Sequence, residues 1–269
     1  MSIISIAIQK GGTGKTTTAI NLAAALMILK KKVLLVDADP QANLTQAVGI
    51  TEEPERNLFT EIRKKIKGEH VSLLDARMYT KTGLHIIPTS IKLPEIESEM
   101  GSGDKSEQLF NGLLRPLESE YDFILIDCPP SQNIISKNAL MASHYVLMPL
   151  QAEYLPLNGV YSFIKYLDKI TESKKEAGLT IEILGFVFTK YDDHKNMNRD
   201  VSEKLKKEFG NKVFNTCIRN NIQLANAQQS GEDIFSFDKR ANGAIDYIAL
   251  AKEFLSKINS NQGKGNKIL

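Results

Sequence analysis

The sequence predicts an α/β fold, a single domain with a doubly wound, mostly parallel sheet and helices on both faces. Apolar runs are nearly continuous rather than alternating, which is typical of strands covered on both faces. Segments with helical periodicity separate these runs, as in consecutive βαβ units. No Pro/Gly/Ser-rich linker interrupts the series. The predicted strands are Ile3 to Ile8, Val33 to Val36, Phe123 to Ile126, Tyr145 to Leu150 and Ile181 to Phe188.

The predicted helices alternate with these strands. An apolar stripe at helical spacing defines each of them. They cover Thr16 to Leu29, Ser106 to Glu120, Asn133 to Met141, Leu157 to Thr171, Asp200 to Phe209 and Ala244 to Ile258.

The remaining segments carry weaker patterns. Residues 49–103 have mixed charge and several turn residues, and there we predict only a helix from Leu58 to Ile66 and a short strand at His85 to Pro88. Val213 and Phe214 suit another short strand. We expect one folded domain over residues 1–258 and a polar, disordered tail over 259–269.

Composition excludes several classes of protein. Hydrophobic residues make up 42% of the chain and charged residues 25%, which excludes a membrane bundle and a disordered chain. The formal charge of +2 does not by itself predict a nucleic-acid partner, so any basic surface must come from local clustering. Cys128 and Cys217 lack metal-ligand spacing, which indicates a reducing, cytoplasmic location. No run approaches the ~18 apolar residues of a membrane span, and we expect no membrane partner.

A candidate phosphate site follows the first predicted strand. The segment from Gln9 to Thr17 reads QKGGTGKTT. Glycines permit positive φ and bring successive N–H groups around phosphate oxygens, and the helix start adds a partial positive charge. Lys15 is placed for β- and γ-phosphates and the Thr16 hydroxyl for magnesium. The alternative is a glycine-rich turn without a ligand. The predicted nucleotide-binding residues are Gly11, Gly12, Thr13, Gly14, Lys15, Thr16 and Thr17.

Three segments of the chain carry a resemblance to a known family. They are KGGTGKTT from Lys10, VLLVDADPQAN from Val33 and FILIDCPPS from Phe123. Together they resemble the ParA family of partition ATPases, part of the deviant Walker A group of P-loop NTPases, and QAEY from Gln151 resembles a QCEY-like element of this family. In the loop, Gln9 replaces the usual first glycine and Lys10 is an additional lysine. The resemblance spans Ile4 to about Lys252, and the chain lacks the paired cluster cysteines of the nitrogenase iron protein and the membrane-seeking helix of MinD in the same group.

Acidic residues end two of the apolar runs. Asp127 follows a buried run, where a carboxylate needs a cation or several donors. The resemblance implies that Asp127 contacts the magnesium shell, that Asp39 positions or activates the attacking water, and that Asp37 has a switch or magnesium-shell role. It also implies that Lys10 reaches the phosphates of the partner subunit. Turn formation is the alternative role of these acids. The predicted catalytic residues are Lys10, Lys15 and Asp39, and the predicted metal ligands are Thr16, Asp37 and Asp127.

The last third of the chain departs from the family pattern. The family has an element resembling PRNxRLSEAPS, whereas this chain reads RNNIQLANAQQ from Arg219. The resemblance implies an adenine-side contact here, for which Asn221 is the candidate. Nearby basic residues form a candidate DNA surface; the alternative is a solvated helix face that also carries Glu203 and Glu208. The candidate DNA-binding residues are Lys195, Arg199, Lys206, Lys207, Arg219, Lys239 and Arg240.

The resemblance implies a cycle that uses ATP and Mg²⁺. Two subunits sandwich ATP, the homodimer binds DNA without sequence preference, and a ParB-like or adaptor protein stimulates slow hydrolysis, so that plasmid or chromosomal cargo is segregated at the bacterial nucleoid. One alternative is a ParA-like ATPase that positions a cytoplasmic protein assembly. Another is a regulatory switch that senses ATP without binding DNA. The polar tail disfavours a membrane-positioning ATPase.

Overall fold

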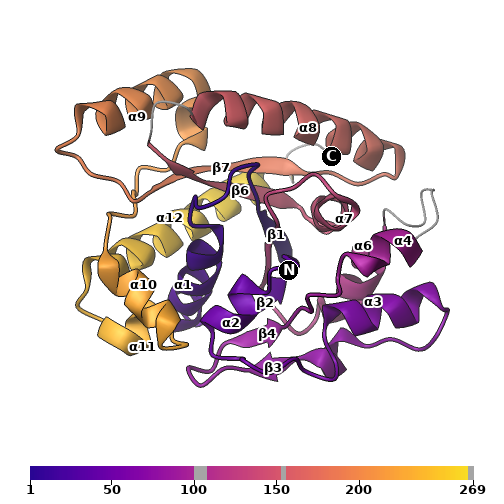
Figure 1. The fold of residues 1–269 in the computed structure, drawn as a ribbon. Helices are drawn as coiled ribbons and strands as arrows, with labels where there is room; N and C mark the ends of the chain where they lie inside the picture. Colours follow the sequence, from indigo (N-terminus) through magenta and orange to yellow (C-terminus); the bar gives the residue numbers. More distant parts are fainter. Residues whose placement is uncertain (100–107, 153–155, 266–269) are drawn as a thin grey trace.

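The computed structural model describes residues 1–99, 108–152 and 156–265. Within them, seven strands form one sheet in the order β3-β4-β2-β5-β1-β6-β7 (Figure 1). Every pairing is parallel except that of β3 with β4, so the predicted α/β fold is confirmed. The strands are β1 (Ser2–Ile6), β2 (Val33–Asp37), β3 (Met78–Tyr79), β4 (His85–Ile87), β5 (Phe123–Asp127), β6 (Tyr145–Gln151) and β7 (Glu182–Thr189).

Helices cover both faces of this sheet (Figure 1). Two hydrophobic cores result, one on each side, because the strand residues are buried on both faces. The first core lies against α3 (Leu58–Ile66), α6 (Leu109–Leu114), α7 (Ile134–Ala142), α8 (Pro156–Glu176) and α9 (Asn196–Phe209), and the second against α1 (Lys15–Ile28), α2 (Asn43–Ala47), α10 (Ile222–Gln229), α11 (Ile234–Asp238) and α12 (Asn242–Gly265). Helix α4 (Glu95–Glu99) and the short 3₁₀ segments Leu73–Ala76, Arg115–Leu117 and Gly210–Lys212 lie in the connections.

The sheet register brings two acidic residues together. Asp37 at the end of β2 pairs with Asp127 at the end of β5, and Ile6 at the end of β1 pairs with Asp127 from the other side. The chain leaves β1 at this same edge and enters α1 through the glycine-rich loop. Parallel α/β sheets bind ligands outside the carboxyl ends of their strands, so this edge is where a site is expected.

Several elements differ from the sequence prediction. Strand β3 was not predicted, because two residues are too few to show a pattern. The helix predicted from Ser106 to Glu120 ends at Leu114, where Pro116 shifts the chain into a 3₁₀ turn; its start lies partly in residues 100–107, outside the described residues. Val213 forms an isolated bridge with Phe186 rather than a strand.

Helix α9 begins four residues before the predicted Asp200. The reason is tertiary, because the side chain of Asn198 is buried and its amide donates to the carbonyl oxygen of Ala152 at 2.6 Å. The side-chain Oδ1 of Asn198 also accepts from the N–H of Asp192 at 2.9 Å. At the other end of the chain, α12 continues to Gly265, so most of the segment expected as a disordered tail is helical; residues 266–269 lie outside the described residues.

Candidate functional site

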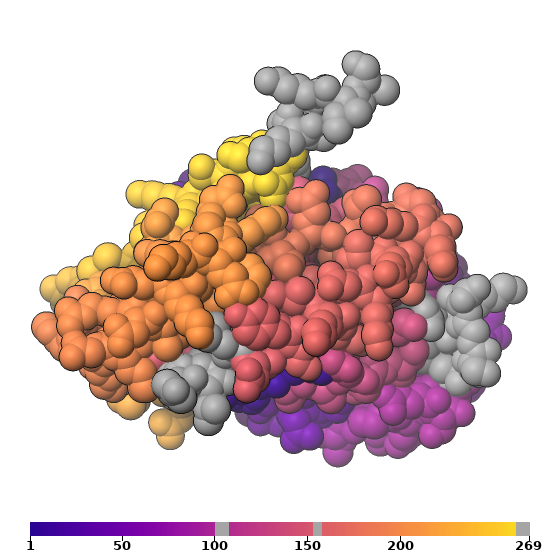
Figure 2. Space-filling model, turned by 90° about the horizontal axis from the view of Figure 1, so that it is seen from above, coloured from indigo at the N-terminus to yellow at the C-terminus, as the bar shows by residue number. Residues whose placement is uncertain are grey.

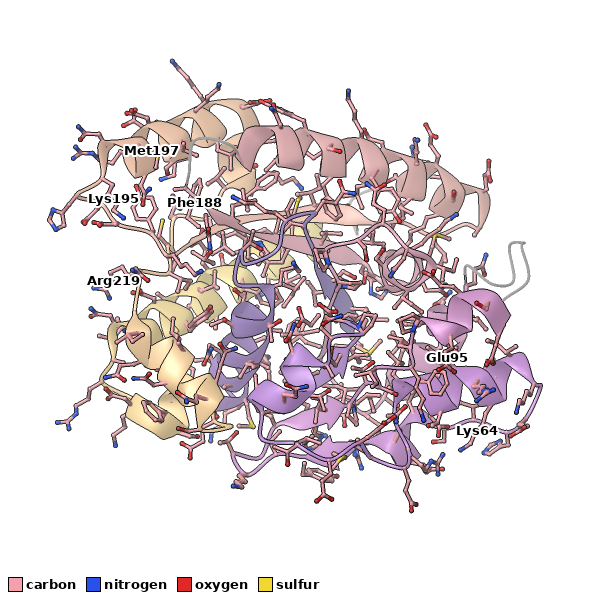
Figure 3. The ribbon with its side chains drawn as sticks, viewed as in Figure 1. Lys64, Glu95, Phe188, Lys195, Met197 and Arg219 are labelled. Atoms are coloured by element: carbon pink, nitrogen blue, oxygen red, sulfur yellow. The ribbon has the colours of Figure 1, made fainter. Side chains whose placement is uncertain are left out.

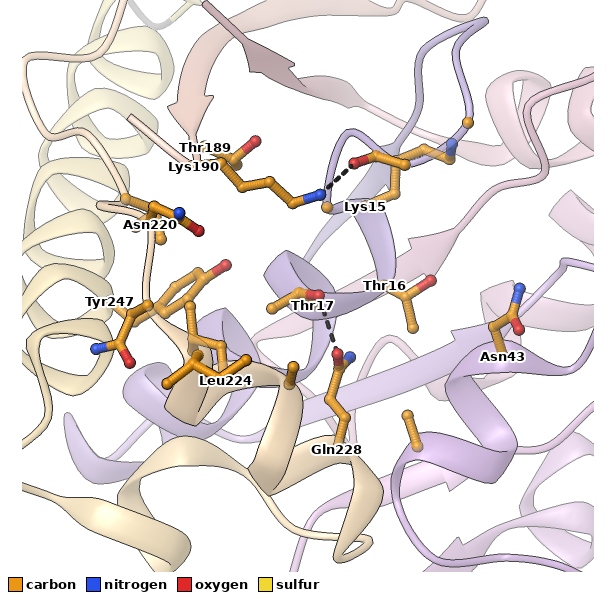
Figure 4. A pocket seen from close by; sticks show the side chains of 18 of the residues that line it. Lys15, Thr16, Thr17, Asn43, Thr189, Lys190, Asn220, Leu224, Gln228 and Tyr247 are labelled. Carbon is orange, nitrogen blue, oxygen red and sulfur yellow. Dashed lines mark hydrogen bonds between the residues drawn. The ribbon is translucent and has the colours of Figure 1, made fainter. Parts of the chain in front are cut away.

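A cavity of about 640 Å³ lies at the carboxyl edge of the sheet (Figure 4). Its walls come from the glycine-rich loop with the start of α1, the segment after β2, Pro130 after β5, the end of β7, α10 with its preceding turn, and Tyr247 of α12. Of the residues predicted to bind nucleotide or to act in catalysis, those on its walls are Gly11, Gly12, Gly14, Lys15, Thr16, Thr17, Asp39 and Asn221.

The loop has the backbone that its glycines predict. Gly12 and Gly14 have φ values of 75° and 84°, and Gly14 caps the N-terminus of α1 without a side-chain hydrogen bond. The Lys15 side chain is only 7% exposed, and its Nζ donates to the carbonyl oxygen of Lys10 at 3.1 Å. Burial lowers the pKa of Lys15, and nearby Asp127 opposes this shift. An anion, such as a bound phosphate, would stabilise an ammonium group that is buried to this extent.

The floor of the site holds an acid with a free lone pair. Thr16 Oγ1 donates to Asp127 Oδ2 at 2.6 Å. The other oxygen, Oδ1, is buried and has no hydrogen-bond partner in the part of the chain that the structure describes. Burial, together with the neighbouring Asp37, raises the pKa of Asp127 to about 8. A divalent cation beside Thr16 would satisfy this oxygen, so these residues fit magnesium.

The described residues contain no group of three or more His, Cys, Asp or Glu side chains placed to hold a metal. A cation beside Thr16 and Asp127 would therefore need further oxygen ligands from outside the protein, and Mg²⁺ commonly takes them from phosphates and water. The metal site and the nucleotide site are thus expected to form together.

Asp37 holds the segment from Asp39 to Thr45 rather than lining the open cavity. Its Oδ2 accepts from the N–H and the hydroxyl of Thr45 at 2.8 and 2.7 Å, and its Oδ1 accepts from the N–H of Asp39 at 3.1 Å. Both carboxylate oxygens of Asp37 therefore already accept hydrogen bonds from the protein, whereas a direct metal ligand would present an oxygen to the cation. Burial raises the pKa of Asp37 to about 7. These bonds fix the turn that places Asp39 on the cavity wall, where Asp39 Oδ1 accepts from the N–H of Gln41 at 3.0 Å.

The far wall of the cavity suits a ring system. Leu224 and Tyr247 supply apolar surface beside Asn220 (Figure 4). The Asn221 side chain is committed to capping α10, because its Oδ1 accepts from the N–H of Gln223 at 2.8 Å. Thr17 Oγ1 donates to Gln228 Oε1 at 3.2 Å and ties this wall to α1. The site thus combines a phosphate end with an apolar end.

Known proteins resemble this chain over almost its full length. A family profile described as "AAA domain" matches residues 1–181. The chain is 33% identical over 267 residues to the chromosome partitioning protein ParA of Caulobacter vibrioides, which covers 98% of this chain and 97% of that protein. This chain belongs to the ParA family of partition ATPases. It is also 37% identical over 251 residues to the sporulation initiation inhibitor protein Soj of Bacillus subtilis, covering 93% of this chain and 97% of that protein.

Solved structures share the fold of this ParA-family chain. The cobyrinic acid a,c-diamide synthase of Mycobacterium smegmatis, solved with ADP and magnesium, matches with a TM-score of 0.79 at 28% identity and covers 97% of this chain and 96% of that one. A putative plasmid partition protein of Borrelia burgdorferi, bound to AMPPNP, matches with a TM-score of 0.74 at 25% identity, covering 97% and 99%. The P-loop ATPase fold is therefore shared with nucleotide-bound relatives.

Three polar residues at strand ends contact the loop. The sequence analysis missed two of them, Thr189 and Lys190, and noted Gln151 only as part of the QAEY segment, without a role in the site. Thr189 and Lys190 follow the apolar run of β7, and Gln151 ends β6. Their hydrogen bonds reach the carbonyl oxygens of Thr13 and Gly12. The available signal was their position, because polar residues directly after buried parallel strands gather at the ligand edge. Glu153 and Tyr154 of the QAEY segment lie outside the described residues.

The seven candidate DNA-binding residues do not form one cluster in this ParA-family chain. Those on or just before α9 lie on the face that α8 and α9 cover (Figure 2), whereas the turn from α11 to α12 lies at the opposite end of the molecule (Figure 1). Arg219 lies between these regions, well below Lys195 (Figure 3), and its guanidinium pairs with Asp246 at 2.7 Å. The α9 group is Lys195, Arg199, Lys206 and Lys207; the other is Lys239 and Arg240.

Acidic residues close to the α9 group reduce the net positive charge of this surface. Lys195 approaches Asp192 at 3.9 Å, and Glu208 accepts from the Tyr161 hydroxyl at 2.6 Å. Arg199, Lys206 and Lys207 are exposed. In the part of the chain that the structure covers, no helix has the length and apolarity to cross a membrane.

Proposed function

We propose that this protein is an ATP-driven partition switch of the deviant Walker A type that works in the bacterial cytoplasm. In this proposal it binds ATP with Mg²⁺, dimerises, binds DNA without sequence preference and is returned to the monomer by hydrolysis. The observation that carries the proposal is the Thr16–Asp127 pair, which leaves a buried carboxylate oxygen without a partner beneath the phosphate loop. The nucleotide-bound Mycobacterium smegmatis and Borrelia burgdorferi structures support ATP as the ligand.

Each residue of the site has its own role in phosphoryl transfer. Loop N–H groups and Lys15 hold the phosphates, and Thr16 with Asp127 holds the magnesium shell. Bound magnesium supplies charge neutralisation between the β- and γ-phosphates. Asp39 stands on the wall with one oxygen anchored by Gln41, from which it orients the attacking water as a general base. Asp37 and Thr45 hold Asp39 in that place.

Lys10 acts on the partner subunit in this proposal. It is absent from the described residues that line the cavity of its own chain, although the next two loop residues, Gly11 and Gly12, do line it. Its carbonyl oxygen faces inward to Lys15. A lysine that approached the phosphates of the facing subunit would stabilise the charge that develops in the transition state, as arginine fingers supplied in trans do. ATP binding and dimerisation would then support each other.

DNA binding is assigned to the α9 group. Dimerisation presents two copies of this surface on one rigid body, which doubles the number of phosphate contacts. Partition functions named for the Caulobacter vibrioides and Borrelia burgdorferi relatives support this assignment. A ParB-like or adaptor protein is the proposed partner that stimulates hydrolysis and releases the dimer from DNA.

Nucleotide binding and turnover of purified protein test the proposal. We expect magnesium-dependent ATP hydrolysis at about 10⁻⁴ to 10⁻² per second without a partner, by analogy with unassisted switch NTPases. Lys15→Ala should weaken ATP binding by about 10- to 100-fold, because it removes a charged hydrogen bond to phosphate. Lys165→Ala on exposed α8 is the control and should bind normally. Full ATP affinity in Lys15→Ala would contradict the assignment of the loop.

A further inference from the structure

Three side chains from the ends of β6 and β7 hold two consecutive carbonyl groups of the phosphate loop. Thr189 Oγ1 donates to the carbonyl oxygen of Thr13 at 2.7 Å. Lys190 Nζ donates to the carbonyl oxygen of Gly12 at 3.3 Å, and its side chain lies along the loop in Figure 4. Gln151 Nε2 donates to this same Gly12 oxygen at 2.5 Å. The loop is therefore anchored by residues far away in the sequence.

These bonds determine where the loop's N–H groups point. Each peptide is trans, so its C=O and N–H are antiparallel. A Gly12 carbonyl turned toward Lys190 and Gln151 directs the Thr13 N–H away from them, and a Thr13 carbonyl turned toward Thr189 does the same for the Gly14 N–H. Within the described residues neither N–H has a protein acceptor. Both donors are therefore left for a ligand, as a phosphate cradle requires.

The local structure shows that the strand end is built for this contact. Lys190 has a φ of 50°, a left-handed conformation that is uncommon for a residue with a side chain. Thr189 is 3% exposed, and a Cβ added at Gly14 would already touch its side chain at 3.6 Å. Loop and strand end thus pack directly. The Thr189 hydroxyl also lies 3.3 Å from the carbonyl oxygen of Leu150, and the shorter distance of 2.7 Å to the Thr13 oxygen makes the loop its main acceptor.

We propose that Thr189, Lys190 and Gln151 are positioning residues for nucleotide phosphates. They hold the Gly12 and Thr13 carbonyls away from the bound anion and so aim the Thr13 and Gly14 N–H groups at it. Without these donors the carbonyl dipoles are free to turn toward the phosphates and repel them. The inference rests on the proposed nucleotide binding. It gives Lys190 and Gln151 overlapping roles, since they share one acceptor, and Thr189 a role of its own.

Substitution of Thr189 is the sharpest single test. Thr189→Val keeps the volume and removes the donor, and it should raise the dissociation constant of MgADP by about 5- to 20-fold, the loss expected when one hydrogen bond no longer orders the cradle. Thr189→Ser should restore the affinity. Thr171→Val is the matched control, because the Thr171 hydroxyl also donates to a backbone carbonyl, that of Leu167 at 2.8 Å on α8, and it should leave the affinity unchanged.

A double-mutant cycle tests the shared acceptor. Lys190→Met and Gln151→Leu should each weaken MgADP binding less than about threefold, because the other donor remains on Gly12, and the double variant should lose more than the product of the two effects. Lys190→Arg should bind normally. Lys212→Met is the control at the opposite end of β7, where Lys212 Nζ donates to the Ile183 carbonyl oxygen.

The melting temperature of nucleotide-free protein separates positioning from folding. We expect each variant to melt within a few degrees of the wild type while MgADP affinity falls. Unchanged MgADP affinity in Thr189→Val, or multiplicative effects in the Lys190/Gln151 cycle, would overturn the inference. A wild-type protein that binds no nucleotide would instead overturn the proposed function itself, so the two failures are distinguishable.

Discussion

Asp37 and Asp127 occupy paired positions at the ends of β2 and β5, and both carboxyl groups are buried. Burial is the main cause that raises their pKa values, to about 7 for Asp37 and about 8 for Asp127. The Asp37 carboxylate also disfavours ionisation of Asp127, and the Asp39 carboxylate disfavours ionisation of Asp37. The ligand-free protein therefore carries electrostatic repulsion at the position proposed for the cation.

The first prediction concerns pH. The folded pKa of each acid lies above its unfolded value near 4, so the stability they contribute is fully present below pH ~4 and is lost as the pH rises through about 7 and 8. Between these limits each group lowers the free energy of unfolding by up to about 1.4 kcal/mol per pH unit. Asp127→Asn should therefore stabilise the ligand-free protein at pH 8.5 and change it little at pH 4.5.

Thermal melts across this pH range measure the effect as the difference between wild type and variant. Glu55→Gln, an exposed acid, is the control. A pH dependence of stability that is the same in Asp127→Asn and in wild type would contradict the raised pKa of Asp127.

Magnesium with nucleotide should also release protons on binding at pH 7, which calorimetry in buffers of different ionisation enthalpy detects.

The second prediction separates binding from hydrolysis. If Asp39 acts on the water, Asp39→Ala should bind ATP with Mg²⁺ and accumulate as a dimer on a sizing column, with turnover reduced by about 10²-fold or more. Lys10→Ala should bind ATP and elute as a monomer, because its contribution lies across the interface. An ATP-dependent dimer in Lys10→Ala would show that the trans role is wrong.

The third prediction concerns DNA. Replacing Arg199, Lys206 and Lys207 together by Glu should weaken binding of the ATP-bound Asp39→Ala dimer to random-sequence DNA and leave ATP affinity unchanged. The logarithm of the wild-type binding constant should fall with log salt by about 0.9 for each phosphate contacted, and the triple variant should show a smaller slope. The charge-matched control reverses three exposed lysines near α3 and β3: Lys67, Lys81 and Lys92.

A gel shift at low salt decides this prediction. No retardation of DNA by the Asp39→Ala dimer would remove DNA from the proposed cycle and favour a protein-only switch. Retardation that the α9 triple variant leaves unchanged would move the contact to another surface, with Lys239 and Arg240 at the opposite end as the next positions for charge reversal.

The fourth prediction concerns the contact between the loop after α2 and the turn after α10. Gly231, with a φ of 72°, lies so close to the loop after α2 that an added Cβ would stand 2.7 Å from Gly49 Cα. Gly231→Ala should lower the free energy of unfolding by about 2–4 kcal/mol, through backbone strain and overpacking together. Gly68→Ala is the matched control, because Gly68 has a φ of 74° and open space around its Cβ position, and should cost about 1–2 kcal/mol. Equal losses in urea melts would show that the contact relaxes freely.

Local features of the chain were predictable because their physical causes are local. The loop from Gly11 to Thr16 needs glycine at its two positive-φ positions, Gly12 and Gly14, and a helix start directly after them, and consecutive residues of the sequence supply both. Strands that are buried on both faces appear in the sequence as apolar runs. The sheet, and the positions of Asp37 and Asp127 at strand ends, could therefore be predicted from the sequence. The meeting of these acids follows from parallel pairing, since the carboxyl ends of neighbouring strands share an edge.

Features that depend on distant partners were decided only by the tertiary structure. The bond from Thr189 to Thr13 joins residues 176 positions apart, and nothing in the local pattern of either residue specifies the other. Asn198 starts α9 early because its amide reaches Ala152, and Arg219 faces Asp246 of α12 rather than the other cations. Helical periodicity predicts which side of a helix is polar, but the surface that several such sides form together depends on how the helices pack. For that reason the candidate DNA residues, a single group in the sequence, became two separated patches in the fold, with Arg219 between them and paired with Asp246.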